Sequence, residues 1–122
     1  MKRPYAYVCS PYGENPKLYS RKTKAYCRKL FDLGYMPIAP HLLFPQFLNE
    51  DIPTERSEGL EMARELLRRS RVVVVCGKEL SDGMIEEMTL ARRLGITMTT
   101  LEGIERIDSR IQEEQENENE IE

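Results

Sequence analysis

The sequence predicts an α/β protein built on a small doubly wound parallel sheet, Rossmann-like or flavodoxin-like, of four to five strands flanked by helices. Short runs of β-forming residues alternate with longer amphipathic segments, in the order β-α-β-loop-α-β-α-β. The run Val72–Val75 consists of four valines, which is typical of a parallel strand buried on both faces. The segments between the strands are long enough for right-handed crossovers, so the strands are expected to be parallel.

The first half of the chain is expected to hold two strands and one helix. Residues 5–9 are rich in β-formers and predict a short strand, and the prolines and glycine of residues 10–16 predict a loop. Apolar or partly apolar side chains then recur with helical spacing at Tyr19, Thr23, Tyr26, Leu30 and Leu33. Gly34 ends this helix. Residues 35–39 predict a second strand, and Pro37 within it indicates a sheet edge.

The second half begins with an irregular stretch. Residues 40–53 carry three prolines among apolar residues, so we expect a long ordered loop with room for a helical turn. A helix is predicted from about Glu55 to Ser70, with Leu60, Ala63, Leu66 and Leu67 on its buried side. The valine strand, a helix over residues 81–94 ending at Gly95, and a strand over residues 96–101 follow.

Length and charge indicate one domain with an acidic end. The chain has 122 residues and a formal net charge of -3. Residues 111–122 contain glutamates and no basic residue, so we expect an α/β domain over residues 1–108 and a disordered acidic tail over residues 109–122. The rest of the chain is mildly positive. This charge does not indicate nucleic acid as a partner, but it suits a small phosphorylated ligand.

Cysteine usage and hydropathy indicate a cytoplasmic protein. The three cysteines Cys9, Cys27 and Cys76 lack metal-ligand spacing, and we expect free thiols, with no metal and no cofactor. The sequence shows no signal peptide and no apolar run that approaches transmembrane length, so no membrane partner is expected.

Glu87 is the strongest candidate for a functional residue. At about 100° per residue, it falls among Met84, Met88, Ala91 and Leu94 on the apolar stripe of its helix, whereas Glu86 points toward water. A carboxylate on an apolar face is costly to ionise without a partner. The helix also follows the valine strand, and open α/β sheets bind ligands at the carboxyl ends of their strands.

Three loops are expected to meet at that edge of the sheet, and they supply the other candidates. These candidate ligand-binding residues are Ser10, Pro11, Tyr12, Gly13, His41, Ser81, Asp82, Gly83 and Met84. Simpler roles stay open for several of them. Ser81 and Asp82 can be helix N-caps, and His41 and Tyr12 can be structural. Glu87 can be paired with an arginine or stabilised by the N-terminus of its helix.

Three short motifs carry a resemblance to a known family. They are Tyr7–Tyr12 (YVCSPY), Gly34–His41 (GYMPIAPH) and Ser81–Glu87 (SDGMIEE). In this order and at these separations, the chain resembles the nucleoside 2-deoxyribosyltransferase-like superfamily, and in particular its small bacterial and phage branch of unknown function. The resemblance covers roughly Tyr5 to Leu101.

The resemblance implies a fold, a chemistry and an assembly. In the enzymes of that superfamily, a glutamate attacks the anomeric carbon of a 2-deoxynucleoside, and the resemblance places Glu87 in that role. It implies that Gly83 lets the sugar approach and that the loop from Ser10 to Gly13 lines the sugar. Relatives commonly form dimers or larger oligomers, so a homo-oligomer is expected. The enzymes also carry an aspartate near the start of the third strand, where this chain has Arg71, so the general acid is unassigned.

The leading hypothesis is a protein that binds a nucleoside or nucleotide-like ligand. If it is an enzyme, it cleaves or transfers an N-glycosidic bond with Glu87 as the nucleophile. Two alternatives stay open: a non-catalytic module that binds or sequesters a nucleotide, and a structural oligomeric protein with a relic pocket.

Overall fold

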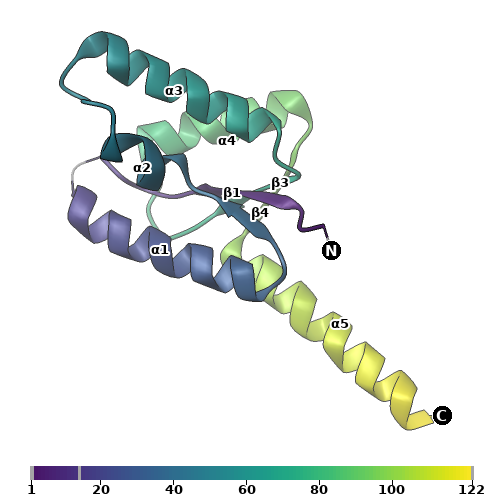
Figure 1. The fold of residues 1–122 in the computed structure, drawn as a ribbon. Helices are drawn as coiled ribbons and strands as arrows, with labels where there is room; N and C mark the ends of the chain where they lie inside the picture. Colours follow the sequence, from purple (N-terminus) through teal and green to yellow (C-terminus); the bar gives the residue numbers. More distant parts are fainter. Residues whose placement is uncertain (1, 14, 122) are drawn as a thin grey trace.

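A computed structural model describes residues 2–13 and 15–121 as one parallel sheet between two layers of helices (Figure 1). The strands are β1 (Tyr5–Cys9), β2 (Met36–Ile38), β3 (Val72–Val75) and β4 (Thr97–Thr100), in the order β2-β1-β3-β4. All three strand pairs are parallel, and Tyr7 of β1 is in register with Ile38 on one side and Val73 on the other. The predicted doubly wound α/β fold is therefore confirmed, with four strands.

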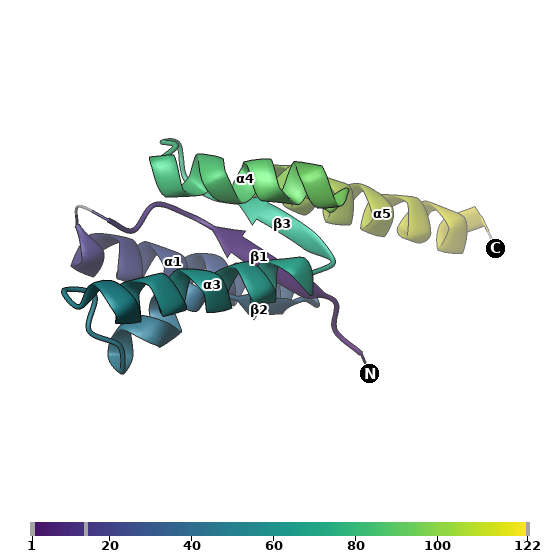
Figure 2. The same ribbon diagram turned by 90° about the horizontal axis from the view of Figure 1, so that it is seen from above.

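Five α-helices connect and flank these strands. They are α1 (Pro16–Asp32), α2 (Pro40–Leu43), α3 (Pro53–Arg68), α4 (Asp82–Leu94) and α5 (Leu101–Ile121), and a 3-10 helix (Phe44–Gln46) follows α2. Figure 1 shows α3 and α4 on one side of the sheet and α1 on the other, and Figure 2, seen from above, shows α3 and α4 next to each other along that side. The segment predicted as a long ordered loop with room for a helical turn thus contains two short helices.

The alternation of side chains along β1 and β3 divides the core into two halves. Ala6 and Val8 pack with Leu30 of α1 and with Leu101 and Ile104 of α5. Tyr7 and Cys9 point to the opposite face, where they form a second cluster with Leu67 of α3 and with Met84 and Ala91 of α4. Because both faces are covered, the valine strand is almost wholly buried, as its sequence predicts.

The acidic end of the chain belongs to the long helix α5, and the disordered tail over residues 109–122 stays a prediction. Leu101 and Ile104 anchor the start of α5 in the core, and the helix then extends away from the rest of the molecule through Ile121 (Figure 1). Glutamate and glutamine are good helix formers, and the pair between Arg110 Nε and Glu114 Oε1 at 3.4 Å adds support. The division at residue 108 stays a prediction, and α5 is continuous across it.

The cysteines are free, as predicted. Cys9 and Cys76 are buried and Cys27 is half-buried. Burial raises the pKa of Cys76 to about 12, which makes its thiolate scarce at neutral pH. Among residues 2–13 and 15–121, no helix combines the length and apolarity needed to cross a membrane.

Candidate functional site

A cavity of about 790 Å³ lies at the carboxyl ends of β1 and β3. Its walls come from the loop after β1, the segment containing α2 and the 3-10 helix, α3, and the start of α4. The chain runs from β1 to β2 on one side and from β3 to β4 on the other, so the cavity occupies the topological switch point of the sheet. Its volume is in the usual range for small-molecule sites.

All ten candidate site residues line this one cavity. They are Ser10, Pro11, Tyr12, Gly13, His41, Ser81, Asp82, Gly83, Met84 and Glu87. The three segments that carry them are far apart in sequence, and the parallel strands bring these segments together at one edge of the sheet. Their placement follows the sequence analysis, and their functional roles stay predictions.

Glu87 lies in the second turn of α4 with its side chain only 14% exposed. Its Oε1 is 3.8 Å from Nε2 of His41, whose side chain is 28% exposed. Its Oε2 is buried and has no hydrogen-bond partner in the described part of the chain. The neighbour of Glu87 is thus a histidine and not an arginine, while stabilisation by the N-terminus of α4, the other simple interpretation, stays open. The adjacent Glu86 is exposed, as predicted.

His41 lies in α2 and faces Glu87 on one side and Tyr12 on the other. The rings of Tyr12 and His41 are stacked, with centroids 5.5 Å apart and planes at 17°. This stack joins the loop after β1 to the segment after β2. The distance of 3.8 Å between Nε2 of His41 and Oε1 of Glu87 is within ion-pair range but longer than a normal hydrogen bond. Nε2 is therefore free to hydrogen-bond to another group.

Tyr7 is the residue near the site that the sequence analysis missed. It is fully buried, and its hydroxyl, like Oε2 of Glu87, makes no hydrogen bond of good geometry within residues 2–13 and 15–121. The two groups lie side by side: burial raises the pKa of this phenol most, and the charge of Glu87 and hydrogen bonding to its carboxylate raise it further. The alternation along β1 was the available signal, because it places Tyr7 on the sheet face that α4 covers.

Both candidate serines already have hydrogen-bond partners within the protein. The Ser81 hydroxyl accepts a hydrogen bond from the backbone N–H of Met84 at 3.2 Å, so this side chain is the N-cap of α4. The hydroxyls of Ser10 and Thr23 are 2.9 Å apart, and their hydrogen bond ties the loop after β1 to α1. Gly83 lies in the first turn of α4 with open space beside it, because the nearest atom to an added Cβ is Ser81 Oγ at 4.0 Å.

The lining of the cavity is acidic, in contrast to the positive net charge of residues 1–110. The mild positive charge of residues 1–110 suits a phosphorylated ligand, but those basic residues lie mostly elsewhere on the surface. The carboxylates that line the cavity are Glu50, Asp51, Glu55, Glu79, Asp82 and Glu87, and Arg56 is its one lysine or arginine among the described residues.

Arg71 lies at the opposite end of the sheet. It is exposed, immediately precedes β3, and donates its backbone N–H to the carbonyl of Tyr5 at the start of β1. Its identity therefore says nothing about the cavity. The wall from the middle of α3 is formed by Gly59, Leu60 and Ala63, none of which is an acid. Leu60 was predicted to be buried, yet it is 41% exposed because it borders this open space.

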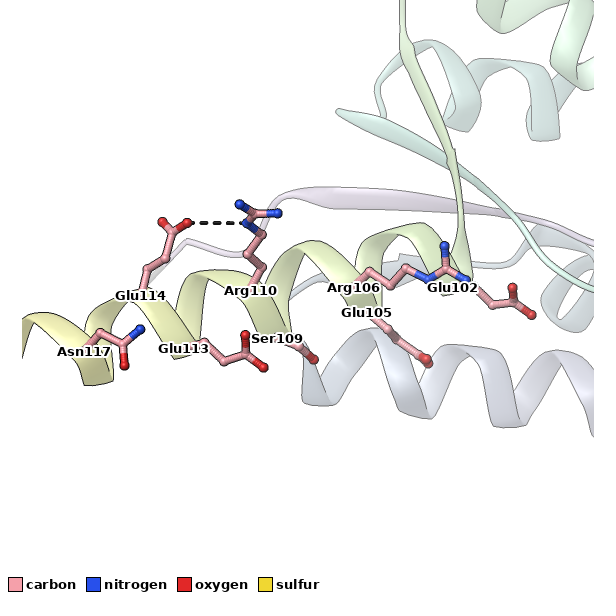
Figure 3. A pocket seen from close by; sticks show the side chains of 8 residues that line it. All are labelled: Glu102, Glu105, Arg106, Ser109, Arg110, Glu113, Glu114 and Asn117. Carbon is pink, nitrogen blue, oxygen red and sulfur yellow. Dashed lines mark hydrogen bonds and ion pairs between the residues drawn. The ribbon is translucent and has the colours of Figure 1, made fainter.

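A second hollow lies along α5 and is a weaker candidate. Figure 3 shows its lining side chains, which run from Glu102 to Asn117 and all come from this one helix. The pair Arg110–Glu114 spans part of it. With a wall from only one element, this surface lacks the convergent groups of a small-molecule site.

Comparison with known proteins agrees with the architecture. The family model for a domain of unknown function, DUF7768, matches residues 4–101. No curated protein matches the chain. A 2-deoxyribosyltransferase from the psychrotolerant bacterium Bacillus psychrosaccharolyticus is similar in structure, with a TM-score of 0.61 and 17% sequence identity over 79% of this chain and 70% of that one.

A second solved structure is a 2-deoxyribosyltransferase from Leishmania mexicana. Its TM-score is 0.49 at 16% identity, and the match covers 80% of this chain but 63% of that protein, which is less than two thirds of its length. The match to residues 4–101 shows that the chain belongs to the DUF7768 family, and its structure has a nucleoside 2-deoxyribosyltransferase-like fold.

Proposed function

We propose that the chain binds a nucleoside in the cavity and breaks its N-glycosidic bond with Glu87 as the nucleophile. The observation that carries the proposal is the state of Glu87. Its carboxylate lines a cavity of ligand size, one of its oxygens has no hydrogen-bond partner of good geometry among the described residues, and the other lies 3.8 Å from the imidazole of His41. A carboxylate so placed is suited to react with an electrophilic carbon.

The reaction follows from these groups. An oxygen of Glu87 attacks the anomeric carbon, the bond to the base nitrogen breaks, and its electron pair leaves with the base. His41, 3.8 Å from the carboxylate, is placed to supply a proton to a departing base. In its neutral form, His41 then activates the acceptor. Water as the acceptor gives hydrolysis, and a second base gives transfer.

Tyr12 and Tyr7 are given supporting roles in this proposal. The stack of Tyr12 on His41 fixes the imidazole plane and presents an aromatic edge to the cavity. The buried hydroxyl of Tyr7, close to Glu87, is placed to donate a hydrogen bond to the carboxylate when the side chains adjust to a ligand.

The test uses Glu87→Gln and a matched control on the same helix. Nucleosides and nucleotides are screened for thermal stabilisation of the protein and, in the same samples, for released free base. Glu87→Gln is expected to abolish base release and keep ligand binding, because the amide matches the carboxylate in shape but is a poor nucleophile. Glu86→Gln, which changes an exposed neighbour, is expected to leave both unchanged. Base release at the original rate by Glu87→Gln contradicts the proposal.

A non-catalytic binding module is the second candidate. The absence of a carboxylate from the middle of α3 favours it, because this wall then supplies no acid and His41 alone is assigned to protonate a base. Intact ligand recovered in stoichiometric amount after long incubation supports this alternative and excludes turnover.

Assembly and location are also proposals. Ile107 and Ile111 are exposed on α5, at 59% and 49%, and would be covered in a homo-oligomer. Sedimentation at several concentrations tests this assembly, which the structural alternative requires as well. A cytoplasmic protein without a nucleic-acid partner remains the expectation from the sequence.

A further inference from the structure

The charge of the cavity sets a preference among the substrates that the proposed reaction could use. Six carboxylates line the cavity, while Arg56 is the one lysine or arginine there among the described residues. The negative charge of this lining also acts on Tyr12: burial raises the pKa of its phenol, and the charge of Glu50 raises it further. A cavity lined by one sign of charge concentrates ligands of the opposite sign.

This lining disfavours a 5′-phosphate. A phosphate dianion inside the cavity would meet several carboxylates and could pair with Arg56 alone. Arg56 is itself exposed, so an ion pair with it would be screened by solvent and salt. A nucleoside without a phosphate avoids this repulsion.

The small number of proton donors close to Glu87 favours one kind of leaving base. A neutral base leaves as an anion unless it is protonated, and His41 is the one group assigned to that task, because the middle of α3 contributes only Gly59, Leu60 and Ala63 to the cavity wall. A base whose glycosidic nitrogen already carries positive charge leaves as a neutral molecule and needs no proton. The same positive charge is attracted by the carboxylates around the cavity.

We infer that the preferred substrate is an unphosphorylated N-glycoside of a cationic base, such as a pyridinium or an N7-alkylated purine nucleoside. This inference rests on the proposed function. An oxygen of Glu87 bonds to the anomeric carbon, and the electron pair of the broken C–N bond neutralises the base. Water then attacks the glycosyl ester, so that its oxygen joins the anomeric carbon, its proton passes to His41, and the Glu87 carboxylate is regenerated.

The test compares matched ligands on the full chain. Nicotinamide riboside is compared with its uncharged dihydro form for the charge of the base, and with nicotinamide mononucleotide for the phosphate; 7-methylguanosine and guanosine form a second pair. Binding is measured by calorimetry at low and high salt, and base release by chromatography. We expect the cationic nucleoside to bind at least about tenfold more tightly than either partner at low salt, with the ratio shrinking as salt rises.

Removing carboxylates from the lining tests whether the charge of the cavity causes this binding preference. The double variant Glu50→Gln/Asp51→Asn removes two exposed carboxylates of the lining and should reduce the ratio severalfold, whereas Glu58→Gln, on the exposed surface of α3, should not change it. Equal or tighter binding of the neutral nucleoside or the mononucleotide, with base released, overturns this inference and leaves the proposed function standing. If no ligand of the set binds or loses its base, this inference is overturned, and the wider nucleoside screen with Glu87→Gln decides the proposed function.

Discussion

Tyr7→Phe is expected to destabilise the protein. The ring of Tyr7 is fully buried between β1 and α4, and its hydroxyl lies beside the Glu87 carboxylate, whose charge and hydrogen bonding raise the pKa of the phenol. Oε2 of Glu87 is also buried and has no other hydrogen-bond donor within the described part of the chain. Phenylalanine keeps the ring and its packing but leaves this buried carboxylate oxygen without a donor.

The size of the effect follows from the cost of leaving a buried polar group without a partner. Such a group costs about 1–3 kcal/mol, so the free energy of unfolding should fall by about 1–2 kcal/mol in Tyr7→Phe. For a domain of this size, that corresponds to a decrease in Tm of roughly 4–10 °C.

Urea unfolding followed by circular dichroism measures the change. The midpoint should move to lower urea with an unchanged slope. Tyr5→Phe is the matched control, since Tyr5 lies on the same strand with 40% of its surface exposed, and its midpoint should stay in place. A gain of 1 kcal/mol or more in Tyr7→Phe refutes the reasoning, because it would mean that the hydroxyl has no favourable interaction with Glu87 in the folded protein.

Three further predictions concern α4 and the core. Ser81→Ala should lower the free energy of unfolding, measured with urea, by about 1 kcal/mol, because it removes the N-cap hydrogen bond of α4. Ser81→Asp should restore the lost stability. Equal stability of all three proteins would mean that the cap contributes nothing. Gly83→Ala should raise the free energy of unfolding by up to about 1 kcal/mol, because position 83 is helical and has open space for a Cβ. The same change should weaken the thermal shift given by any ligand of the cavity. An undiminished shift would mean that Gly83 is not part of the binding site. Folding stability should fall between pH 9 and 12, because the pKa of Cys76 is raised from 9.0 to about 12 by burial and the unfolded thiol ionises first. The loss is up to about 1.4 kcal/mol per pH unit for each such thiol, and a stability that is flat across this range contradicts the assignment.

The fold was largely predictable from the sequence because its signals are local. Four valines in a row and the glycines that follow two helices fix β3 and the ends of α1 and α4 to within one or two residues. The three loops converged as predicted, because parallel strands present their carboxyl ends at one edge of the sheet.

The remaining features depend on contacts that no local pattern encodes. The proximity of His41 to Glu87 arises because α2 folds back over the cavity, and the surroundings of Tyr7 become apparent only when α4 is placed on β1. The acidic lining includes Glu50 and Asp51 from an irregular segment, whereas the net charge of residues 1–110 is positive. Helix α5 continues into the segment for which the sequence predicts disorder, where helix-forming residues and the Arg110–Glu114 pair accompany a low hydrophobicity.

Peptide mapping of the protein after acid quenching during turnover tests the central claim most directly. A substrate that releases its base should leave a glycosyl group, visible as a mass increase, on the α4 peptide that contains Glu87. The proposal predicts that fragmentation places this group on Glu87 and that Glu87→Gln carries none. Base release with the label on another residue, or persisting in Glu87→Gln, would contradict the assignment of Glu87 as the nucleophile.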